Sequence, residues 1–183
     1  MIYFTSDLHL GHNKEFIYKS RGFNSIEDHD NALIENWNNM VSSDDDVYVL
    51  GDLMLGDKER GINLLNQLNG RVHIVVGNHD TTNKIDLYAA KLDTVVEIKP
   101  IIILKYKKYR FYLSHYPTIT SSPEESKLKD YLINLYGHTH QTNKFYNEIP
   151  FMYNVGLDCH QNKPVSIDKI ISDCEEKFKQ KQI

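Results

Sequence analysis

"IVVGNHD", residues 74–80, joins an apolar segment directly to a cluster of polar groups. Ile74, Val75 and Val76 are β-branched, and no polar residue alternates with them, which is typical of a strand covered on both faces. The residues that follow, Gly77 to Asp80, are not strand formers. Such an exit is either an ordinary turn, since Gly, Asn and Asp favour turns, or a strand that delivers ligands to a site at its carboxyl end.

The composition describes a single globular domain that spans residues 1–183. Hydrophobic residues make up 40% and charged residues 25% of the chain, which is usual for a soluble protein. The N-terminal sequence has no secretory-signal pattern, and no apolar run has the length of a membrane span. Cys159 and Cys174 are too few for a disulfide framework, so we expect a cytoplasmic protein. The net charge of −4 makes long nucleic acid an unlikely partner.

Short apolar segments alternate with helical patterns along the chain. We expect strands at Ile2–Ser6, Val47–Leu50, Val72–Val76, Val95–Leu104, Arg110–Ser114, Leu132–Tyr136 and Phe151–Val155. We expect helices from Ser25 to Met40, at Lys58–Leu68, at Ile85–Lys91 and from Ser166 to Phe178. This alternation predicts one α/β domain with a sheet that is partly parallel and partly antiparallel.

Asp, Asn and His follow these strands at the point where each one ends. The residues concerned are Asp7 and His9 in SDLHLGH, Asp52 in GD, Asn78, His79 and Asp80 in GNHD, His115 in SHYP, and His138 and His140 in GHTH. The segment after the last expected strand adds Asn154, Gly156 and Asp158. Since binding sites of α/β proteins lie outside the carboxyl ends of strands, these positions predict one shared site.

The residue types indicate a metal centre. Imidazole, carboxylate and amide ligands without thiolate suit divalent cations such as Mn, Fe, Zn or Ni. The pairs Asp7/His9 and His138/His140, with Asp52, Asn78 and His115, exceed the four ligands of a tetrahedral zinc. They suffice for two ions that share a bridging carboxylate, an arrangement typical of phosphatases and nucleases.

The ordered set D-x-H, GD, GNHD, a lone His and GH-x-H resembles the calcineurin-like metallophosphoesterase superfamily. The resemblance runs from Asp7 to His140, and "NVGLD" and "KPVSID" beyond it look like the small single-domain members from bacteria and phages. It implies an αββα sandwich of mixed β-sheets flanked by helices. It also implies a hydrolase, a phosphatase or phosphodiesterase that cleaves a phosphate mono- or diester of a small molecule or nucleotide by metal-hydroxide attack.

The resemblance also assigns roles to the site residues. Asp7, His9, Asp52 and His140 would hold the first of two divalent ions. Asp52, Asn78, His115 and His138 would hold the second, with Asp52 bridging. Manganese is the expected metal, with Fe, Zn and Ni open. His79 would donate a proton to the leaving oxygen or stabilise charge on the phosphate, and Asp80 would orient the imidazole of His79.

Two alternatives stay open beside this reading. One is a nuclease that acts on short nucleic acid, and the other is a non-catalytic scaffold on the same fold. A metallo-β-lactamase-like hydrolase is set aside, because "HTHQTN" at 138–143 lacks the Asp-His that its motif needs. Gly56 stands where protein phosphatases of the superfamily carry an Arg, and no segment between motifs is long enough for a capping domain. A small phosphate ester is therefore the expected substrate, and no membrane association is expected.

The remaining candidates are weaker. We expect His29, His73 and His160 to be structural rather than functional, with His29 on a solvated helix position and His73 facing solvent from its strand. His12 could equally contact substrate or hydrogen-bond its own loop. The loop Tyr116–Ser126 would be either an active-site lid, with Tyr116 against the leaving group, or a plain surface connection.

Overall fold

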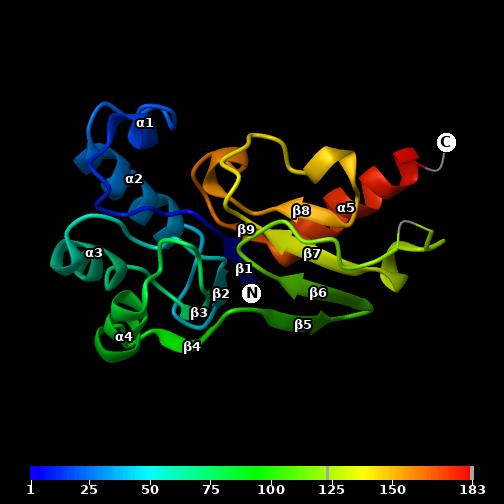
Figure 1. Ribbon diagram of the computed structural model, residues 1–183, viewed down its shortest axis with the longest axis horizontal. Helices are drawn as coiled ribbons and strands as arrows, with labels where there is room; N and C mark the ends of the chain where they lie inside the picture. Colours follow the sequence, from blue (N-terminus) through cyan, green and yellow to red (C-terminus); the bar gives the residue numbers. More distant parts are fainter. Residues whose placement is uncertain (123, 182–183) are drawn as a thin grey trace.

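Two β-sheets packed against each other, with helices on the outside, form the protein (Figure 1). The computed structural model describes residues 1–122 and 124–181. The first sheet has the strand order β4-β3-β2-β1-β9, in which β1 to β4 are parallel and β9 is antiparallel to β1. Its strands are β1 (Ile2–Thr5), β2 (Asp46–Val49), β3 (Arg71–Val75), β4 (Val95–Lys99) and β9 (Val165–Ser166).

The second sheet has the order β5-β6-β7-β8. β5 and β6 form an antiparallel hairpin, whereas β6, β7 and β8 run parallel to one another. Its strands are β5 (Ile102–Tyr106), β6 (Tyr109–Leu113), β7 (Leu132–Tyr136) and β8 (Met152–Asn154). Both sheets are thus mixed, as the sequence predicts.

The helices cover the outer faces. They are α1 (Glu15–Tyr18), α2 (Ile26–Asn38), α3 (Lys58–Leu65), α4 (Thr82–Lys91) and α5 (Ile167–Lys181). α2, α3 and α4 pack on the first sheet around a core that includes Val47 and Val49. Tyr48 and Leu50 point to the opposite face of the same strand and enter a second core, between the two sheets and α5. The αββα arrangement expected from the sequence is therefore confirmed.

Burial on both faces explains the apolar run that ends in GNHD. Ile74 contributes to the core under the helices and Val75 to the core between the sheets, and both side chains are fully buried. A polar residue at either position would lose its water without gaining a partner.

The structure differs from the expected elements in several places. The expected strand Val95–Leu104 is two strands, β4 and β5, which belong to different sheets. Pro100 lies between them, and because it has no N–H it cannot continue the ladder. The hairpin turn consists of Lys107 and Lys108 alone. Helix α1, which the sequence pattern did not indicate, occupies the connection after β1. Among the described residues no helix is long and apolar enough to cross a membrane.

The carboxyl ends of six strands meet along one rim of the sandwich. A parallel bridge between Ser6, directly after β1, and Gly156, after β8, joins the two sheets there. The Ser6 hydroxyl also donates to the carbonyl of Leu50 at the end of β2 (2.7 Å). The loops after β1, β2, β3, β6, β7 and β8 consequently open onto the same surface.

Candidate metal centre

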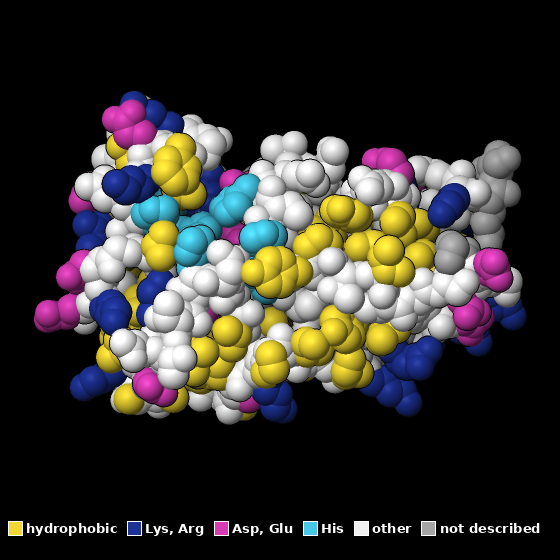
Figure 2. Space-filling view, viewed as in Figure 1, with side chains coloured by type: hydrophobic (Ala, Val, Ile, Leu, Met, Phe, Trp, Pro, Cys, Tyr) yellow, Lys and Arg dark blue, Asp and Glu magenta, His cyan; other side chains and the backbone are white. Residues whose placement is uncertain are grey.

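Histidines gather in a hollow on this rim (Figure 2). The structure brings all seven predicted ligands to it: Asp7, His9, Asp52, Asn78, His115, His138 and His140. They come from the loops after five strands, three of the first sheet and two of the second.

Several ligand positions have an unusual backbone conformation. Asp7, His9, Asp52, His138 and His140 all have positive φ, between 49° and 68°. This region is uncommon for residues with a side chain, and strain of this kind is concentrated at functional sites. The tight turns let the main chains of the first two loops pair, because the amides of Asp7 and His9 donate to Gly51 and Asp52 (3.1 and 3.0 Å).

Asp7, His9 and His140 form the first ligand group, with ligand atoms that all lie within 4.8 Å of one another. His9 Nε2 lies 3.2 Å from His140 Nε2, which in turn lies 3.8 Å from Asp7 Oδ1. Burial, together with Arg21 and the neighbouring histidines, lowers the pKa of His9 to about 2, so its imidazole is neutral. Neutral imidazole is the form that binds a metal ion.

Asp52 connects this group to a second one. Its Oδ2 lies 3.8 Å from His9 Nε2 and 3.6 Å from His115 Nε2. The amide oxygen of Asn78 lies 2.7 Å from His115 Nε2 and 2.9 Å from His138 Nδ1. Asp7 also lies within 4.8 Å of the ligand atoms of Asp52 and His115, so two carboxylates stand between the groups.

These residues fit divalent cations. Asp7 Oδ1 is buried and has no hydrogen-bond partner among the described residues, an arrangement that a cation would satisfy. Burial raises the pKa of Asp52, and the nearby carboxylates of Asp7 and Asp80 raise it further. A bound cation would offset both effects. Nitrogen and oxygen ligands without sulfur suit the borderline and hard cations named above.

Hydrogen bonds behind the ligands orient two of the imidazoles. His115 Nδ1 lies 2.7 Å from the carbonyl oxygen of Leu50, and His140 Nδ1 lies 3.0 Å from Asp158 Oδ2. Each Nδ1–H therefore donates away from the site, which leaves Nε2 as the atom that can bind a metal.

A buried network that the sequence did not reveal supports the first group. Arg21 binds both carboxylate oxygens of Asp158 and donates to the carbonyls of Asp7 and Leu8 (2.7 and 3.2 Å). Its Nη1 also lies 3.1 Å from Nε2 of His29, whose Nδ1 lies 3.0 Å from Asp30. His29 is fully buried, so the expectation that it is solvated is wrong: its helix turns this face toward Arg21.

His79 lies at the edge of the centre and is 45% exposed at its side chain. Its ring contacts that of His9 at 5.7 Å between centroids, and its Nε2 lies 4.0 Å from Asp52 Oδ2. The backbone amide of His79 donates to Asp52 Oδ1 (2.9 Å). An exposed imidazole beside a buried ligand group can exchange a proton with a bound substrate.

Asp80 acts on the backbone rather than on the imidazole of His79. Its Oδ2 accepts from the amides of Asp52 and Gly77 (2.8 and 2.9 Å), and its Oδ1 accepts from the Tyr88 hydroxyl (3.0 Å). Within the described part of the chain, no hydrogen bond joins this carboxylate to the His79 ring, because the turn at Gly77 folds it inward. The orienting role implied by the sequence is corrected to one that fixes the Asp52 loop.

Lys84 completes the support of the GNHD loop. It is buried, and its ammonium group donates to the carbonyls of His79 (2.9 Å) and Met54 (2.6 Å). Burial lowers the pKa of this lysine, although the carboxylates of Asp80 and Asp52 oppose the shift. No sequence signal marks this lysine, because a lysine beside an expected amphipathic helix is usually solvated.

A pocket of about 760 Å³ adjoins the first ligand group. It is lined by His9, His12, Phe16, Ile17, Ser20, Arg21, His79, His140, Thr142, Leu157, Asp158, Gln161 and Asn162. His12, whose role the sequence left open, thus lies in the pocket wall, and its buried Nδ1 has no hydrogen-bond partner in the described part of the chain.

None of the described residues in the loop Tyr116–Ser126 lines this pocket. Two residues of the loop are held against β7. The amide of Thr118 donates to Asn134 (2.8 Å), and Ser121 accepts from the amide of Leu132 (2.9 Å). These bonds favour the surface connection over the lid, while Pro123 lies outside the described residues. Tyr116 alone reaches the centre, with its ring on His138 and His115 at 4.5 and 5.2 Å.

The other histidines have structural partners. His73 lies between Glu97 (2.9 Å) and Asp46 (3.1 Å) and stacks on Tyr48, so the expectation that it simply faces solvent is wrong. His160 Nε2 bonds to the carbonyl of Asn154 (2.9 Å), as a structural histidine should.

Comparison with known proteins agrees with this geometry. An uncharacterized protein of Methanocaldococcus jannaschii is 32% identical over 181 residues, covering 93% of this chain and 89% of that protein. The gene 66 protein of Mycobacterium phage D29 is 29% identical over 203 residues and covers 96% and 98%. The crystal structure of a protein of unknown function from Aquifex aeolicus has the same fold, with a TM-score of 0.69, 24% identity and coverage of 94% and 98%.

The family model of the calcineurin-like phosphoesterase superfamily domain matches residues 1–177, nearly the whole chain. That match and the Asp/His groups on the rim lead to one conclusion. The chain belongs to the calcineurin-like phosphoesterase superfamily and is a metal-dependent phosphoesterase.

Proposed function

We propose that the protein hydrolyses a phosphate ester of a small molecule or nucleotide with two divalent cations, of which manganese is the first choice. Asp7, His9, Asp52 and His140 would hold one cation, and Asp52, Asn78, His115 and His138 the other. The observation that carries the proposal is the position of the Asp52 carboxylate, within 4 Å of imidazoles from both groups. A carboxylate within reach of both sets of ligands is what a bridged pair of ions requires.

The charges of the site suit an anionic substrate. When bound, two divalent cations activate water as a nucleophile near neutral pH and neutralise charge on the phosphate. Their charge exceeds that of the Asp7 and Asp52 carboxylates, the two acidic ligands, since imidazole and amide ligands are neutral. The rim therefore attracts phosphate although the whole chain carries a net charge of −4.

His79 would supply the proton that the leaving oxygen needs. It lines the pocket beside the first group, and its half-exposed ring can reach a bound ester and recover a proton from water. Lys84 holds the carbonyl of His79 and thereby fixes the position from which the ring acts.

The scaffold alternative is not favoured. A protein that merely reused the fold would have no need for a complete set of seven ligands, strained backbone at five of them, and His79 at the rim. Both cysteines are free thiols, which suits the cytoplasm, where we place the enzyme.

Replacement of Asp52 tests the proposal. With Mn²⁺ present, Asp52→Asn should lose at least about 100-fold in activity on bis(p-nitrophenyl) phosphate and bind less metal, because the carboxylate between the groups becomes neutral. Asp86→Asn on the exposed face of α4 is the matched control and should behave as wild type. Full activity of the Asp52→Asn variant would overturn the assignment.

A further inference from the structure

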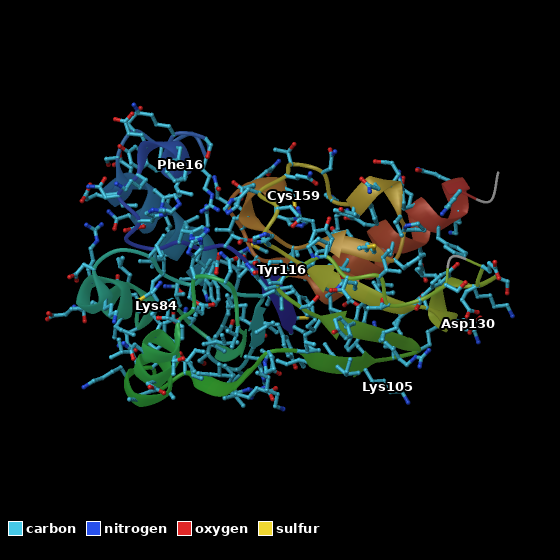
Figure 3. The ribbon with its side chains drawn as sticks, viewed as in Figure 1. Phe16, Lys84, Lys105, Tyr116, Asp130 and Cys159 are labelled. Carbon is cyan, nitrogen blue, oxygen red and sulfur yellow. The ribbon has the colours of Figure 1, made fainter. Side chains whose placement is uncertain are left out.

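Two exposed aromatic side chains stand on either side of the metal centre. Within the described residues, eight large hydrophobic side chains are exposed, and only two of these are aromatic: Phe16 (70%) and Tyr116 (50%). Figure 3 shows Phe16 on α1 and Tyr116 beside the second sheet, and the histidines of Figure 2 lie between them. Exposed aromatic rings at a phosphate site are suited to stack on planar groups of a ligand.

The first ring belongs to the wall of the pocket. α1 buries Ile17 and Tyr18, and this leaves Phe16 on the outer face of its single turn. The Phe16 ring meets His12 edge-on at 5.8 Å, and His12 lies 5.8 Å from the ring of the ligand His9. A planar group stacked on Phe16 would consequently be separated from the first ligand group by one imidazole.

Two residues with side-chain amides, Gln161 and Asn162, line the same pocket. Gln161 and Asn162 both have left-handed backbone, with φ of 54° and 58°. Asn162 is fixed to the helical side, because its Nδ2 donates to the carbonyl of Arg21 (3.2 Å) and its carbonyl accepts from Asn36 (3.1 Å). The side-chain amide of Gln161 makes no hydrogen bond to any described residue. An amide free to bond and an aromatic ring that line the same pocket complement the polar edge and the flat face of a nucleobase.

The second ring lies over the other ligand group. Tyr116 packs edge-on against His138 and His115, both predicted ligands, and half of its surface remains exposed. It lies outside the pocket that contains Phe16. A phosphate held at the centre would therefore have one aromatic ring on each side.

We propose that the substrate is a nucleotide diester with a base on each side of the scissile phosphate, as in a dinucleotide or a short single-stranded oligonucleotide. This rests on the proposed function. One base binds in the pocket against Phe16 and Gln161, and the other stacks on Tyr116. A phosphomonoester, with one organic group, would leave one of the two rings unused.

The position of His79 identifies the leaving nucleoside. Since His79 lines the same pocket as Phe16, the nucleoside in that pocket carries the departing oxygen. One water is consumed: its oxygen bonds to phosphorus and releases a proton to solvent, and the bond from phosphorus to the ester oxygen breaks. That oxygen takes a proton from His79, which regains one from solvent. The products are a nucleoside with a free hydroxyl and a nucleotide with a terminal phosphate.

The test compares three substrates on the Mn²⁺-loaded full chain: thymidylyl-thymidine with two bases, the methyl ester of thymidine 5′-monophosphate with one, and methyl p-nitrophenyl phosphate with none. Phe16→Leu and Tyr116→Leu should each lower kcat/KM for the dinucleotide by about tenfold, the usual loss of one stacked base. For the one-base ester only one of the two variants should do so. Ile103→Ala, at an exposed apolar residue far along the chain, is the control.

A binding measurement separates recognition from turnover. Calorimetry of the metal-free protein with thymidylyl-thymidine should show affinity about tenfold weaker in Phe16→Leu and in Tyr116→Leu. Wild-type affinity and kinetics in both variants would overturn the inference while leaving the proposed function intact. Faster cleavage of the one-base ester than of the dinucleotide by the wild type would also overturn it. Failure of the wild type to cleave any of the three esters would instead count against the proposed function itself.

Discussion

Arg21 and Asp158 form a bidentate ion pair beside the metal centre. Nε and Nη2 of Arg21 each donate to one carboxylate oxygen of Asp158, both at 3.1 Å. The side chain of Arg21 is 1% exposed. The carboxylate of Asp158 also accepts a hydrogen bond from Nδ1 of His140, and Arg21 donates directly to the carbonyl of Asp7. Two members of the first ligand group therefore depend on one arginine that comes from the connection between α1 and α2.

Replacement of Arg21 by lysine should weaken the site while keeping the charge. A lysine cannot bind two carboxylate oxygens and two carbonyls at once, because its ammonium lacks the planar fork of arginine. We expect Mn²⁺ affinity to fall by about 10- to 100-fold, as for other losses behind a metal ligand. Titration calorimetry measures this, with Arg110→Lys on the exposed face of β6 as the control. Unchanged affinity would show that the backbone alone positions Asp7.

Asp158→Asn should destabilise the metal-free protein in a pH-dependent manner. Burial by itself would raise the pKa of Asp158, but hydrogen bonds from His140 and Arg21 outweigh it, and the net shift is downward. A lowered pKa means that the carboxylate stabilises the fold above its ordinary pKa and loses this effect as the pH falls through the folded value. Removing it leaves Arg21 buried without its partner, at a cost of about 3 kcal/mol at neutral pH.

Urea unfolding of wild type and Asp158→Asn at pH 7 and pH 3 checks this expectation. The difference in free energy of unfolding should be smaller at pH 3, because the wild-type carboxylate then begins to be neutralised in the unfolded chain. Equal differences at both pH values would mean that the pair contributes through packing alone.

Lys84→Met should reduce turnover without loss of metal. The variant keeps the aliphatic part of the side chain but leaves the carbonyls of His79 and Met54 without their donor. We expect kcat to fall by about tenfold, since proton transfer depends on the placement of the His79 ring. Kinetics with parallel metal analysis test this, and Lys91→Met, exposed on the same helix, serves as control. If the variant lost bound metal in proportion to its activity, Lys84 would instead act by holding the metal ligands in place.

Gly77→Ala should disrupt the bridging position. A Cβ at residue 77 would lie 2.3 Å from Asp52 Oδ1 and 2.6 Å from its backbone nitrogen, so the Asp52 loop must move. The variant is expected to fold, with a lower melting temperature, and to bind metal at least about tenfold more weakly. Titration calorimetry measures the metal affinity, and thermal unfolding shows whether the variant is folded. Wild-type metal affinity in a folded variant would contradict the close contact between residue 77 and Asp52.

The sequence predicted which Asp, Asn and His side chains come together on the rim, because they follow strands whose ends must meet. Asp7, Asp52 and His115 could be placed together from strand order and residue type alone. Arg21 and Lys84 could not, because each lies in or near a helical segment where a basic residue normally faces water, and only the packed structure shows that carbonyls surround it. Asp80 was placed correctly in the loop but assigned the wrong contact, since sequence spacing does not show in which direction a carboxylate points.

Anomalous scattering from a crystal of the Mn²⁺-loaded protein tests whether two cations share Asp52. Two manganese peaks should lie about 3.5–4 Å apart, one on each side of the Asp52 carboxylate. Asp7, His9 and His140 should surround one peak, and Asn78, His115 and His138 the other. A single peak at full occupancy, or two peaks that do not share Asp52, would contradict it.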